Sequence, residues 1–399
     1  MRLVLVATAL LACGQRAPKK TTGPDPNAGI TETDAERRAG LRDELQDEIL
    51  GSYERDELPD VETTMIPPQV GPARINVGPG DVLFADAVRR MAWSRWPLQL
   101  VPGTPTNVRS KRLEIHLSSE KHVSAAWMSD ELSWRITLCN RTAVIPLRMT
   151  ALYAHDGDRW VQVFEHMSFG RRPEASTDGN LRGAPLINPG EGCPPGPGGP
   201  NDRCPIFDHP RRDVSDELSR VLQALLSNLP DRMSGVVATA PLSDDPSVPA
   251  PSVLLGPAAE AEWHGDQSLD KIQLVDGKVK LEDRRIGVIT SRDGSVKNAT
   301  VAYWVGNLTA DLRDPPGRVR LRGTFVFEKR KDKWVVVQGH ISEPIDDYDL
   351  ALRIWGTALI AEKPLQITCD DGRRSITTTP AAVQSSPEPA AGSQSRGGH

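Results

Sequence analysis

The chain has 399 residues, of which 38% are hydrophobic and 25% are charged. This length allows two or three domains, and the composition is typical of a globular protein with some unstructured sequence between its folded parts. The 48 basic and 53 acidic residues give a net charge of −5, which excludes the strongly basic surface of a nucleic-acid-binding protein.

The first residues have the pattern of an export signal. Arg2 precedes an uncharged apolar run at residues 3–11, which is too short to cross a bilayer as a helix. The run ends in LLAC, which resembles the lipobox of bacterial lipoproteins, and this resemblance implies that Cys13 is acylated and anchors the protein to a membrane. Gly14 replaces the aspartate that retains some lipoproteins in the inner membrane. We therefore expect the outer membrane or the periplasmic face. An ordinary cleaved signal that happens to end in cysteine is the alternative.

Four further cysteines lie in an exported chain, where disulfides can form. Cys193 and Cys204 flank a run of turn-forming residues, and we predict a disulfide between them. Cys139 and Cys369 would be the remaining pair, although the sequence does not establish their pairing. No CxxC motif is present, so a zinc site is not predicted.

Two amphipathic helices are predicted. Thr33 with Glu36 forms the pattern of a capping box, and apolar residues follow on one face at four-residue spacing: Leu41, Leu45, Ile49 and Tyr53. A second helix is expected to begin at Ser215 and to end at Pro230, with another apolar stripe: Leu218, Val221, Leu222, Leu225, Leu226 and Leu229.

Two similar sequences, each typical of a strand, occur in the chain: DRWVQVFEHMSFG (residues 158–170) and DKWVVVQGHISEP (residues 332–344). Residues 145–168 and 319–342 align without a gap, and nine of the 24 positions are identical. The two helices, two Gly-Pro pairs and Trp127 with Trp304 follow the same order at similar spacing. These agreements predict a tandem duplication with a period of about 175 residues.

The second half of each copy is rich in strand-forming residues. In the second copy, strands are expected at residues 278–290, 296–308, 318–328 and 333–342, separated by short turn sequences. Short turns join antiparallel neighbours, so each copy is predicted to be a helix followed by an antiparallel sheet, which is an α+β fold. In residues 347–374, four residues could pack as a short helix or strand: Leu350, Ile354, Trp355 and Leu359.

These residues together resemble a known family. EWHG (residues 262–265), SRDGSVKNATVAYWVGNL and WVVVQGHIS are similar to the SnoaL-like branch of the NTF2-like superfamily. The resemblance covers nearly the whole second copy, and in the first copy it is clear over residues 123–170 and looser before that. It implies a cone, in which a curved antiparallel sheet wraps against helices around a cavity. Members often pair through their sheets, so two cone folds in one chain imply an intrachain pseudo-dimer.

The expected domain organisation follows from these patterns. It comprises a lipoprotein signal peptide (1–12), a flexible tether (13–28), NTF2-like domain 1 (29–172), a Pro/Gly-rich linker (173–212), NTF2-like domain 2 (213–346), a C-terminal extension (347–374) and a disordered tail (375–399).

The resemblance leaves the chemistry open, because some cone-fold relatives are isomerases or dehydratases and many only bind ligands or assemble. Three residues are candidates for general acid/base catalysis: His340, His166 and Glu262. Five residues are candidates for lining a ligand pocket: Trp263, Trp304, His340, Trp127 and His166. Simple strand alternation places Trp334, Val336, Gln338, His340 and Ser342 on one face of the last strand, and the sequence does not tell which face meets the cavity. A histidine bonded to a nearby hydroxyl, with no role in catalysis, is the alternative.

The sequence thus predicts a membrane-anchored lipoprotein with two NTF2-like domains that binds a small apolar ligand or a protein partner without catalysis. The alternative is a cone-fold enzyme of the isomerase or dehydratase type. No cofactor, metal or nucleic-acid partner is predicted, and the sequence does not identify the ligand.

Overall fold

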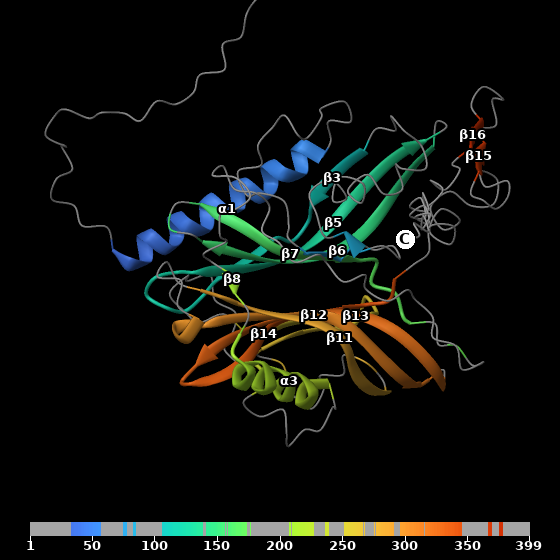
Figure 1. Ribbon diagram of the computed structural model, residues 1–399. Coiled ribbons are helices and arrows are strands. Elements are labelled where there is room, and N and C mark those ends of the chain that lie inside the picture. The colour runs from blue at the N-terminus through green and yellow to red at the C-terminus, as the bar shows by residue number, and fades with distance from the viewer. Residues whose placement is uncertain are drawn as a thin grey trace, which may run out of the picture.

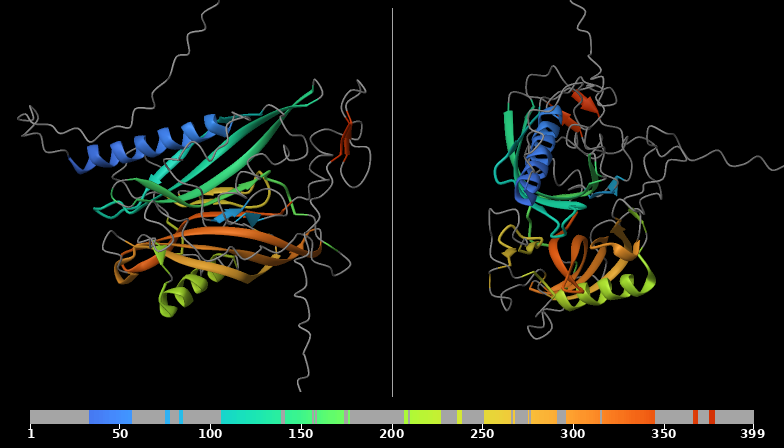
Figure 2. Two further views of the ribbon diagram at one scale, coloured as in Figure 1. Left: turned by 45° about the horizontal axis from the view of Figure 1, so that its top comes forward. Right: turned by 90° about the vertical axis from the view of Figure 1, so that its left-hand side faces the viewer.

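The computed structural model contains two sheets of seven strands each, with a long helix on the outer side of each sheet (Figure 1). The residues that the structure describes are 33–56, 75–77, 83–84, 106–138, 141–155, 157, 159–173, 176, 207–208, 210–226, 236–238, 251–265, 267, 275, 277–290, 296–314, 316–344, 366–368 and 375–377. Along these residues the elements stack in four layers, helix, sheet, sheet and helix, and the two sheets face each other at the centre (Figure 2).

Helix α1 (Asp34–Asp56) and the first sheet form what we call the first unit. The strand order is β2-β1-β7-β6-β5-β3, and β4 also pairs with β5. The strands are β1 (Ile75–Val77), β2 (Leu83–Phe84), β3 (Thr106–Ser110), β4 (Glu114–Leu117), β5 (Ala125–Leu138), β6 (Arg141–His155) and β7 (Trp160–Ser168).

Helix α3 (Arg212–Leu226) and the second sheet form the second unit, with strand order β10-β9-β14-β13-β12-β11-β8. The strands are β8 (Phe207–Asp208), β9 (Val253–Leu255), β10 (Glu262–His264), β11 (Gly277–Ile289), β12 (Val301–Arg313), β13 (Pro316–Arg330) and β14 (Lys333–Ser342). Both sheets are largely antiparallel, with one parallel pair each, and with few helices this is the predicted α+β class.

The two helices lie close to where the apolar periodicity places them. The backbone N–H of Thr33 donates to Glu36 at 2.8 Å and the N–H of Glu36 donates to the Thr33 hydroxyl at 3.2 Å, which is the predicted capping box. Helix α3 begins at Arg212, three residues before the predicted Ser215, and its buried stripe is Leu218, Leu222, Leu225 and Leu226. Leu229 and Pro230 lie outside the described residues.

The strands of the second unit also agree with the sequence pattern, with one correction. Residues 296–308 were expected to form one strand, but Val296–Asn298 is a 3₁₀ turn and β12 begins only at Val301. The β13–β14 hairpin closes through Lys331 and Asp332, which have φ of 48° and 62°. This left-handed conformation matches the twist of a tight hairpin.

The two sheets have matching local geometry. Each has a short strand parallel to its last long strand, β1 beside β7 and β9 beside β14. Each has a register shift in its final hairpin, at Leu152/Tyr153 in the first sheet and Val326/Phe327 in the second. Leu152 and Val326 are equivalent in the gapless alignment of residues 145–168 with 319–342, so the two sequences make the same irregularity at the same place.

The register shift corrects the predicted faces of β14. Strict alternation was expected to place Trp334, Val336 and His340 on one face. In the structure Trp334 and Val336 belong to the core under α3, whereas His340 bonds residues of the other sheet. A bulge inserts one residue on one strand and so reverses the alternation beyond it, and a sequence pattern with period two does not register this.

The register also corrects the predicted match of Trp127 with Trp304. Trp127 pairs with Leu152, and the residue that pairs with the equivalent Val326 is Tyr303. Trp304 is therefore displaced by one position and points to the opposite side of its sheet, into the core of the second unit. Trp127 instead packs in the cluster between the sheets.

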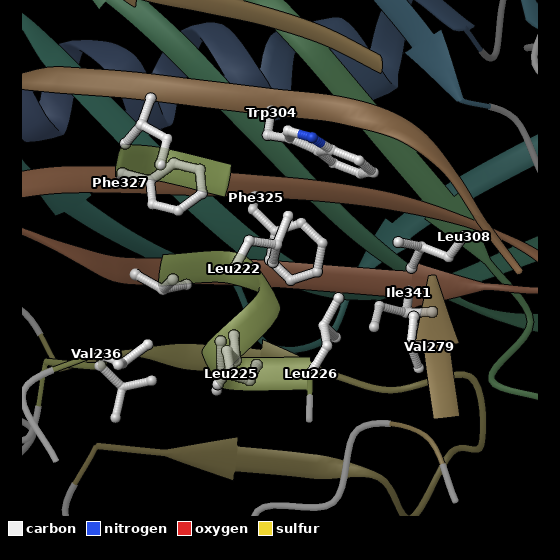
Figure 3. Close-up of a cluster of buried hydrophobic side chains, with 14 of the residues drawn as sticks. Leu222, Leu225, Leu226, Val236, Val279, Trp304, Leu308, Phe325, Phe327 and Ile341 are labelled. Atoms are coloured by element: carbon white, nitrogen blue, oxygen red, sulfur yellow. The ribbon is translucent and has the colours of Figure 1, made fainter. Parts of the chain in front are cut away.

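The core of the second unit is apolar throughout its described part. Leucines of α3 pack against the face of the sheet that carries Trp304, Phe325 and Phe327, and the side chains interdigitate (Figure 3). An added Cβ at Gly339 would lie 2.9 Å from the ring of Phe325, so this glycine leaves room for the ring.

Two predicted boundaries differ from the structure. The linker expected at residues 173–212 contains β8, which pairs with β11 of the second sheet, and Ser176, which bridges to Arg318. The tail expected from residue 375 begins with strand β16 (Ser375–Thr377), paired with β15 (Gln366–Thr368). Cys13 and the other cysteines lie outside the described residues, as do the four apolar residues expected to pack in the extension. No helix in the described part of the chain has the length and hydropathy of a membrane span.

We predict that Leu222→Ala lowers the free energy of unfolding by about 2–5 kcal/mol, because the removed side chain leaves a cavity in the core under α3. Urea denaturation measures this change. Val144→Ala is the matched control, since Val144 is 53% exposed and its truncation should change stability by less than about 0.5 kcal/mol. Equal effects of the two changes would contradict this core.

Candidate functional site

The space between the two sheets contains a buried apolar cluster with polar groups at its centre. Trp127, Leu152 and Phe164 of the first sheet pack with Tyr303 and Val326 of the second, among other residues of the same cluster. Gln338 Nε2 donates to the backbone carbonyl of Met128 at 2.7 Å across the same boundary. The two units are therefore joined by a continuous interface and not only by the chain between them.

His166 and His340 stack at the centre of this interface, with ring centroids 3.9 Å apart and 17° between the ring planes. The Nδ1 atom of His166 lies 3.0 Å from the hydroxyl of Thr324, and its Nε2 atom lies 2.7 Å from that of Ser342.

The contacts of His340 are the reciprocal ones. Its Nδ1 atom lies 3.0 Å from the hydroxyl of Thr150 and its Nε2 atom lies 2.7 Å from that of Ser168. Each ring thus bonds the threonine and the serine that flank the other histidine, as in the interface of a symmetric dimer.

Both imidazoles are fully buried and neutral. Burial, with the charges of Arg322 and Arg148, holds the pKa of His166 well below its ordinary value. Burial, with His166 and Arg148 nearby, has the same effect on the pKa of His340. Since both nitrogens of each ring already face a hydroxyl of the other unit, neither histidine offers an atom to a substrate. This geometry is that of a structural contact.

Arg148 ties the interface to the loop between β9 and β10. Its guanidinium donates to the carbonyls of Gly256 and, at 3.1 Å, Ala258. Burial lowers the pKa of Arg148 to about 10. Arg148 is equivalent to Arg322 in the gapless alignment, and the contact of Arg148 is with the backbone of the other unit.

A second polar cluster lies inside the first unit, on the face of the sheet that α1 covers. The carboxylate of Asp130 on β5 accepts hydrogen bonds from the hydroxyls of Tyr53 (3.2 Å) and Ser110 (3.0 Å) and from the backbone N–H of Arg112 (3.2 Å). The hydroxyl of Tyr53 also lies 3.6 Å from the sulfur of Met149, which pairs with Asp130 in the sheet. Helix α1 thus brings a phenol onto a buried carboxylate.

Three further polar residues share this side of the sheet. Gln162 Nε2 donates to Glu165 at 2.9 Å and to the hydroxyl of Tyr153 at 3.4 Å. Asp130, Tyr153, Gln162 and Glu165 are each no more than 4% exposed. We call these four residues with Tyr53 the polar interior.

Burial raises the pKa of two groups of the polar interior. For Asp130 the burial outweighs the hydrogen bonds that favour its charged form, and its pKa lies above the ordinary value. For Tyr53 burial, together with the charge of Asp130, places the pKa well above the ordinary value. Tyr53 therefore keeps its proton and acts as a hydrogen-bond donor, and Asp130 is a carboxylate that takes up a proton more readily than an exposed one.

In the second unit, the positions equivalent to these polar residues of the sheet are occupied by apolar residues or by glycine. The pairing registers match Asp130 with Gly306, since their partners Met149 and Gly323 are equivalent. The same registers match Tyr153 with Phe327, Gln162 with Val336 and Glu165 with Gly339. The second unit fills this space with hydrocarbon, and the first unit places hydrogen-bonding groups there.

The other predicted site residues are divided among these regions. Trp304 lies in the apolar core of the second unit, and Trp263 packs against that core. Trp127 lies between the sheets with the histidine pair. Glu262 lies on the rim between the units, where it contacts the guanidinium of Arg112 and accepts from His264 Nε2 at 3.0 Å. The structure does not gather the five predicted pocket residues into one site.

Sequence reasoning missed the polar interior. Asp130 and Tyr153 sit in strands whose buried faces were not assigned, and Tyr53 was read only as part of the apolar stripe of a helix. A comparison of the two aligned segments could have found it. Where one segment has a polar residue and the other has glycine or phenylalanine at the equivalent position, the interiors of the two units differ in chemistry. Within the described residues no group of histidine, cysteine and acidic side chains is arranged to hold a metal ion.

Neither the protein-family models nor the curated proteins contain a match to this sequence. Among solved structures, one similar chain is a candidate calcium/calmodulin-dependent protein kinase II association domain from Xanthomonas campestris, at 20% identity over 34% of this chain and 89% of that chain, with a TM-score of 0.25. An NTF2-like protein of unknown function from Pseudomonas putida KT2440 is 12% identical, and the match covers 34% of this chain and 86% of that chain, with a TM-score of 0.25. A candidate dehydratase of the NTF2-like family from Streptomyces avermitilis is 12% identical, and the match covers 34% of this chain and 99% of that chain, with a TM-score of 0.27. Each covers about one third of this chain.

The buried histidine pair predicts an acid-sensitive fold. Both rings are held neutral in the folded protein, whereas in the unfolded chain they bind protons below a pKa of about 6.5. The free energy of unfolding is therefore fully retained above about pH 6.5, and it falls as the pH drops from there toward the lowered pKa values, with a slope of up to about two protons. Urea denaturation at several pH values measures this slope.

The double variant His166→Gln, His340→Gln isolates this contribution, because glutamine keeps a donor and an acceptor but does not titrate. Its slope below about pH 6.5 should be smaller by up to about two protons. His122→Gln is the control, since His122 is exposed. A slope unchanged in the double variant would contradict the assignment.

Proposed function

We propose that this protein is a lipid-anchored protein of the bacterial cell envelope in which two NTF2-like units dock as an intrachain pseudo-dimer and the first unit binds a small molecule. The observation that carries this proposal is the contrast between the interiors of the two units. Asp130 and Tyr153 of the first unit stand where the second unit has Gly306 and Phe327. We attribute binding to the first unit and support of the fold to the second.

The pseudo-dimer is supported by the reciprocity of the central contacts. His166 bonds Thr324 and Ser342, and His340 bonds Thr150 and Ser168, so the same three residue types meet in both directions. A tandem duplication accounts for this pattern, because an isologous interface requires the same surface on both partners.

A small molecule with at least one hydrogen-bonding group fits the first unit better than a wholly apolar one. The carboxylates and phenols of this interior can form hydrogen bonds with a polar group of a ligand, which hydrocarbon side chains cannot. The apolar remainder of such a ligand can contact Met128, Met149 and Leu132, which are buried on the same side of the sheet. We propose binding without a required chemical step.

The described surface offers less support for an apolar protein partner. Val144 is the exposed large hydrophobic residue in the part of the chain whose burial is described. Protein-docking surfaces of soluble proteins are generally marked by contiguous apolar patches. We therefore favour a small ligand over a protein partner.

An isomerase or dehydratase is the second candidate function, and it is favoured by the contact between Asp130 and Tyr53. A buried carboxyl whose pKa is raised can accept a proton from a carbon acid or a hydroxyl, and a phenol beside it can donate to a developing oxyanion. In this proposal the acid/base groups are Asp130 and Tyr53, in place of His166, His340 and Glu262.

Ligand binding is tested by native mass spectrometry of the purified protein, followed by extraction of any retained molecule. We expect Asp130→Asn and Tyr53→Phe to reduce the retained fraction by about tenfold or more, since each removes one hydrogen bond that involves a charged or buried group. Phe327→Leu in the second unit is the matched control and should retain the ligand. Equal retention by Asp130→Asn and the wild type would place the ligand elsewhere.

The lipid anchor is tested by Cys13→Ala. We expect the wild-type protein to sediment with membranes and the variant to remain in the soluble fraction, because several acyl chains on one residue are needed for stable anchoring. A wild-type protein found in the soluble fraction would leave the cleaved-signal alternative in place.

A further inference from the structure

Arg112 connects the polar interior of the first unit to the second unit. Its backbone N–H donates to Asp130 at 3.2 Å, and its guanidinium contacts Glu262 on β10 of the second unit. The guanidinium also lies 3.2 Å from Glu131 and 4.0 Å from Glu114, both in the first unit. One residue therefore bonds the site with its backbone and the neighbouring unit with its side chain.

Glu262 is held in place from its own unit as well. His264 Nε2 lies 3.0 Å from its carboxylate, and the two residues are about 18% and 20% exposed at their side chains. Hydrogen bonds from His264 and Arg112 lower the pKa of Glu262, and the bond to Glu262 raises that of His264. Glu262 is thus an anionic acceptor on a strand, held by His264 and directed at Arg112.

We infer that Glu262 and His264 of the second unit are positioning residues for Asp130 of the first unit, acting through Arg112, so that the ligand site of one unit depends on docking of the other. The inference relies on the proposed function for the role of Asp130 in ligand binding. It assigns a purpose to the EWHG motif, which neither the histidine pair nor the polar interior uses.

The position of Arg112 in the chain explains why an external anchor matters there. Arg112 lies in the short connection between β3 and β4, outside the ladder that β5 forms with either strand. The backbone N–H of Lys111 donates to the carbonyl of Glu131 at 2.8 Å, which holds the beginning of this connection. The orientation of the following N–H toward Asp130 then depends on where the Arg112 side chain is held.

Within the described strands, the anchor residue Glu262 has no acidic counterpart at the equivalent position of the first unit. The β1–β2 and β9–β10 pairings place Leu83 at the position equivalent to Glu262, since Leu83 pairs with Val77 and Glu262 with Leu255. A leucine has no carboxylate to pair with a guanidinium, so this position of the first unit differs in chemistry from Glu262. This asymmetry agrees with a polar interior in the first unit alone.

A second ion pair between the units provides the control. Arg172 lies 2.5 Å from Glu260, in the same loop region as Glu262, but these side chains are 81% and 59% exposed. Ion pairs at such exposure contribute little. Glu260→Gln therefore removes a charge from the same loop without touching Arg112.

Glu262→Gln tests the inference without any ligand, through the carboxyl carbon shift of Asp130 in a pH titration by NMR. The hydrogen bond from Arg112 favours the charged form of Asp130, so its loss should raise the Asp130 pKa. The Arg112 amide should exchange with solvent about tenfold faster. Glu262→Asp, which keeps the charge, should restore most of both effects.

Glu260→Gln should leave both readouts at wild-type values. An Asp130 pKa and an Arg112 exchange rate that are unchanged in Glu262→Gln would overturn the inference, as would equal changes in Glu260→Gln. If these readouts shift as expected but the purified protein retains no ligand, the positioning role stands and the proposed ligand binding fails. The two outcomes are therefore distinguishable.

Discussion

The rest of the structure depends on one constraint, which is that two fully buried imidazoles need four hydrogen-bonding partners from the protein. A buried polar group without a partner costs about 1–3 kcal/mol. Neither unit provides partners for its own histidine, since the bonding hydroxyls of His166 and His340 all come from the opposite unit. The interface therefore forms in one register. A shift of one sheet relative to the other would leave several imidazole nitrogens and hydroxyls without hydrogen-bonding partners at once.

The same constraint explains several of the residues that the two halves share. Four of the nine identical pairs lie in or beside the interface: Arg148 and Arg322, Thr150 and Thr324, His166 and His340, Ser168 and Ser342. Positions that alternate with them, and so face the helices, differ between the halves: Met149 and Gly323, Ala151 and Phe325, Tyr153 and Phe327, Glu165 and Gly339. Two further identical pairs, Leu147/Leu321 and Trp160/Trp334, are core residues, since Leu321 and Trp334 lie under α3. The hydrogen-bonding residues of the interface are thus identical, whereas most of the helix-facing positions differ.

Much of this fold could be predicted from the sequence, because its signals are local. The capping box of α1, the leucine stripe of α3 and the hairpin turns each depend on residues within a few positions of one another. The gapless match of the two final hairpins also survives in the structure, down to the register shift at Leu152 and Val326. Which side chains lie on which face of these hairpins could not be predicted, because a bulge changes the alternation of faces and no residue type in the sequence indicates it.

The candidate site could not be predicted for a related reason. Histidine draws attention as a catalytic residue, yet its function depends on whether its nitrogens are occupied, and here the occupying groups lie some 160 to 190 residues away in the chain. Asp130 drew no attention because a lone acid in a strand reads as solvent-exposed until the opposite face is known to be buried. Burial and long-range pairing, which decide both cases, are properties of the folded chain.

A polar centre also has a consequence for how the two units could diverge. The apolar cluster around Trp127 and Tyr303 contributes buried apolar area to the interface. Apolar surfaces, however, tolerate sliding and repacking more readily than hydrogen-bonded groups do. The reciprocal histidine bonds fix the relative position of the sheets, so the helix-covered faces need not contribute to docking. Each interior is then free to change: one is filled by Phe325 and Phe327, while the other keeps Asp130 and Tyr53 beneath α1. One unit can in this way act as a rigid support for the other, whose interior carries the polar groups.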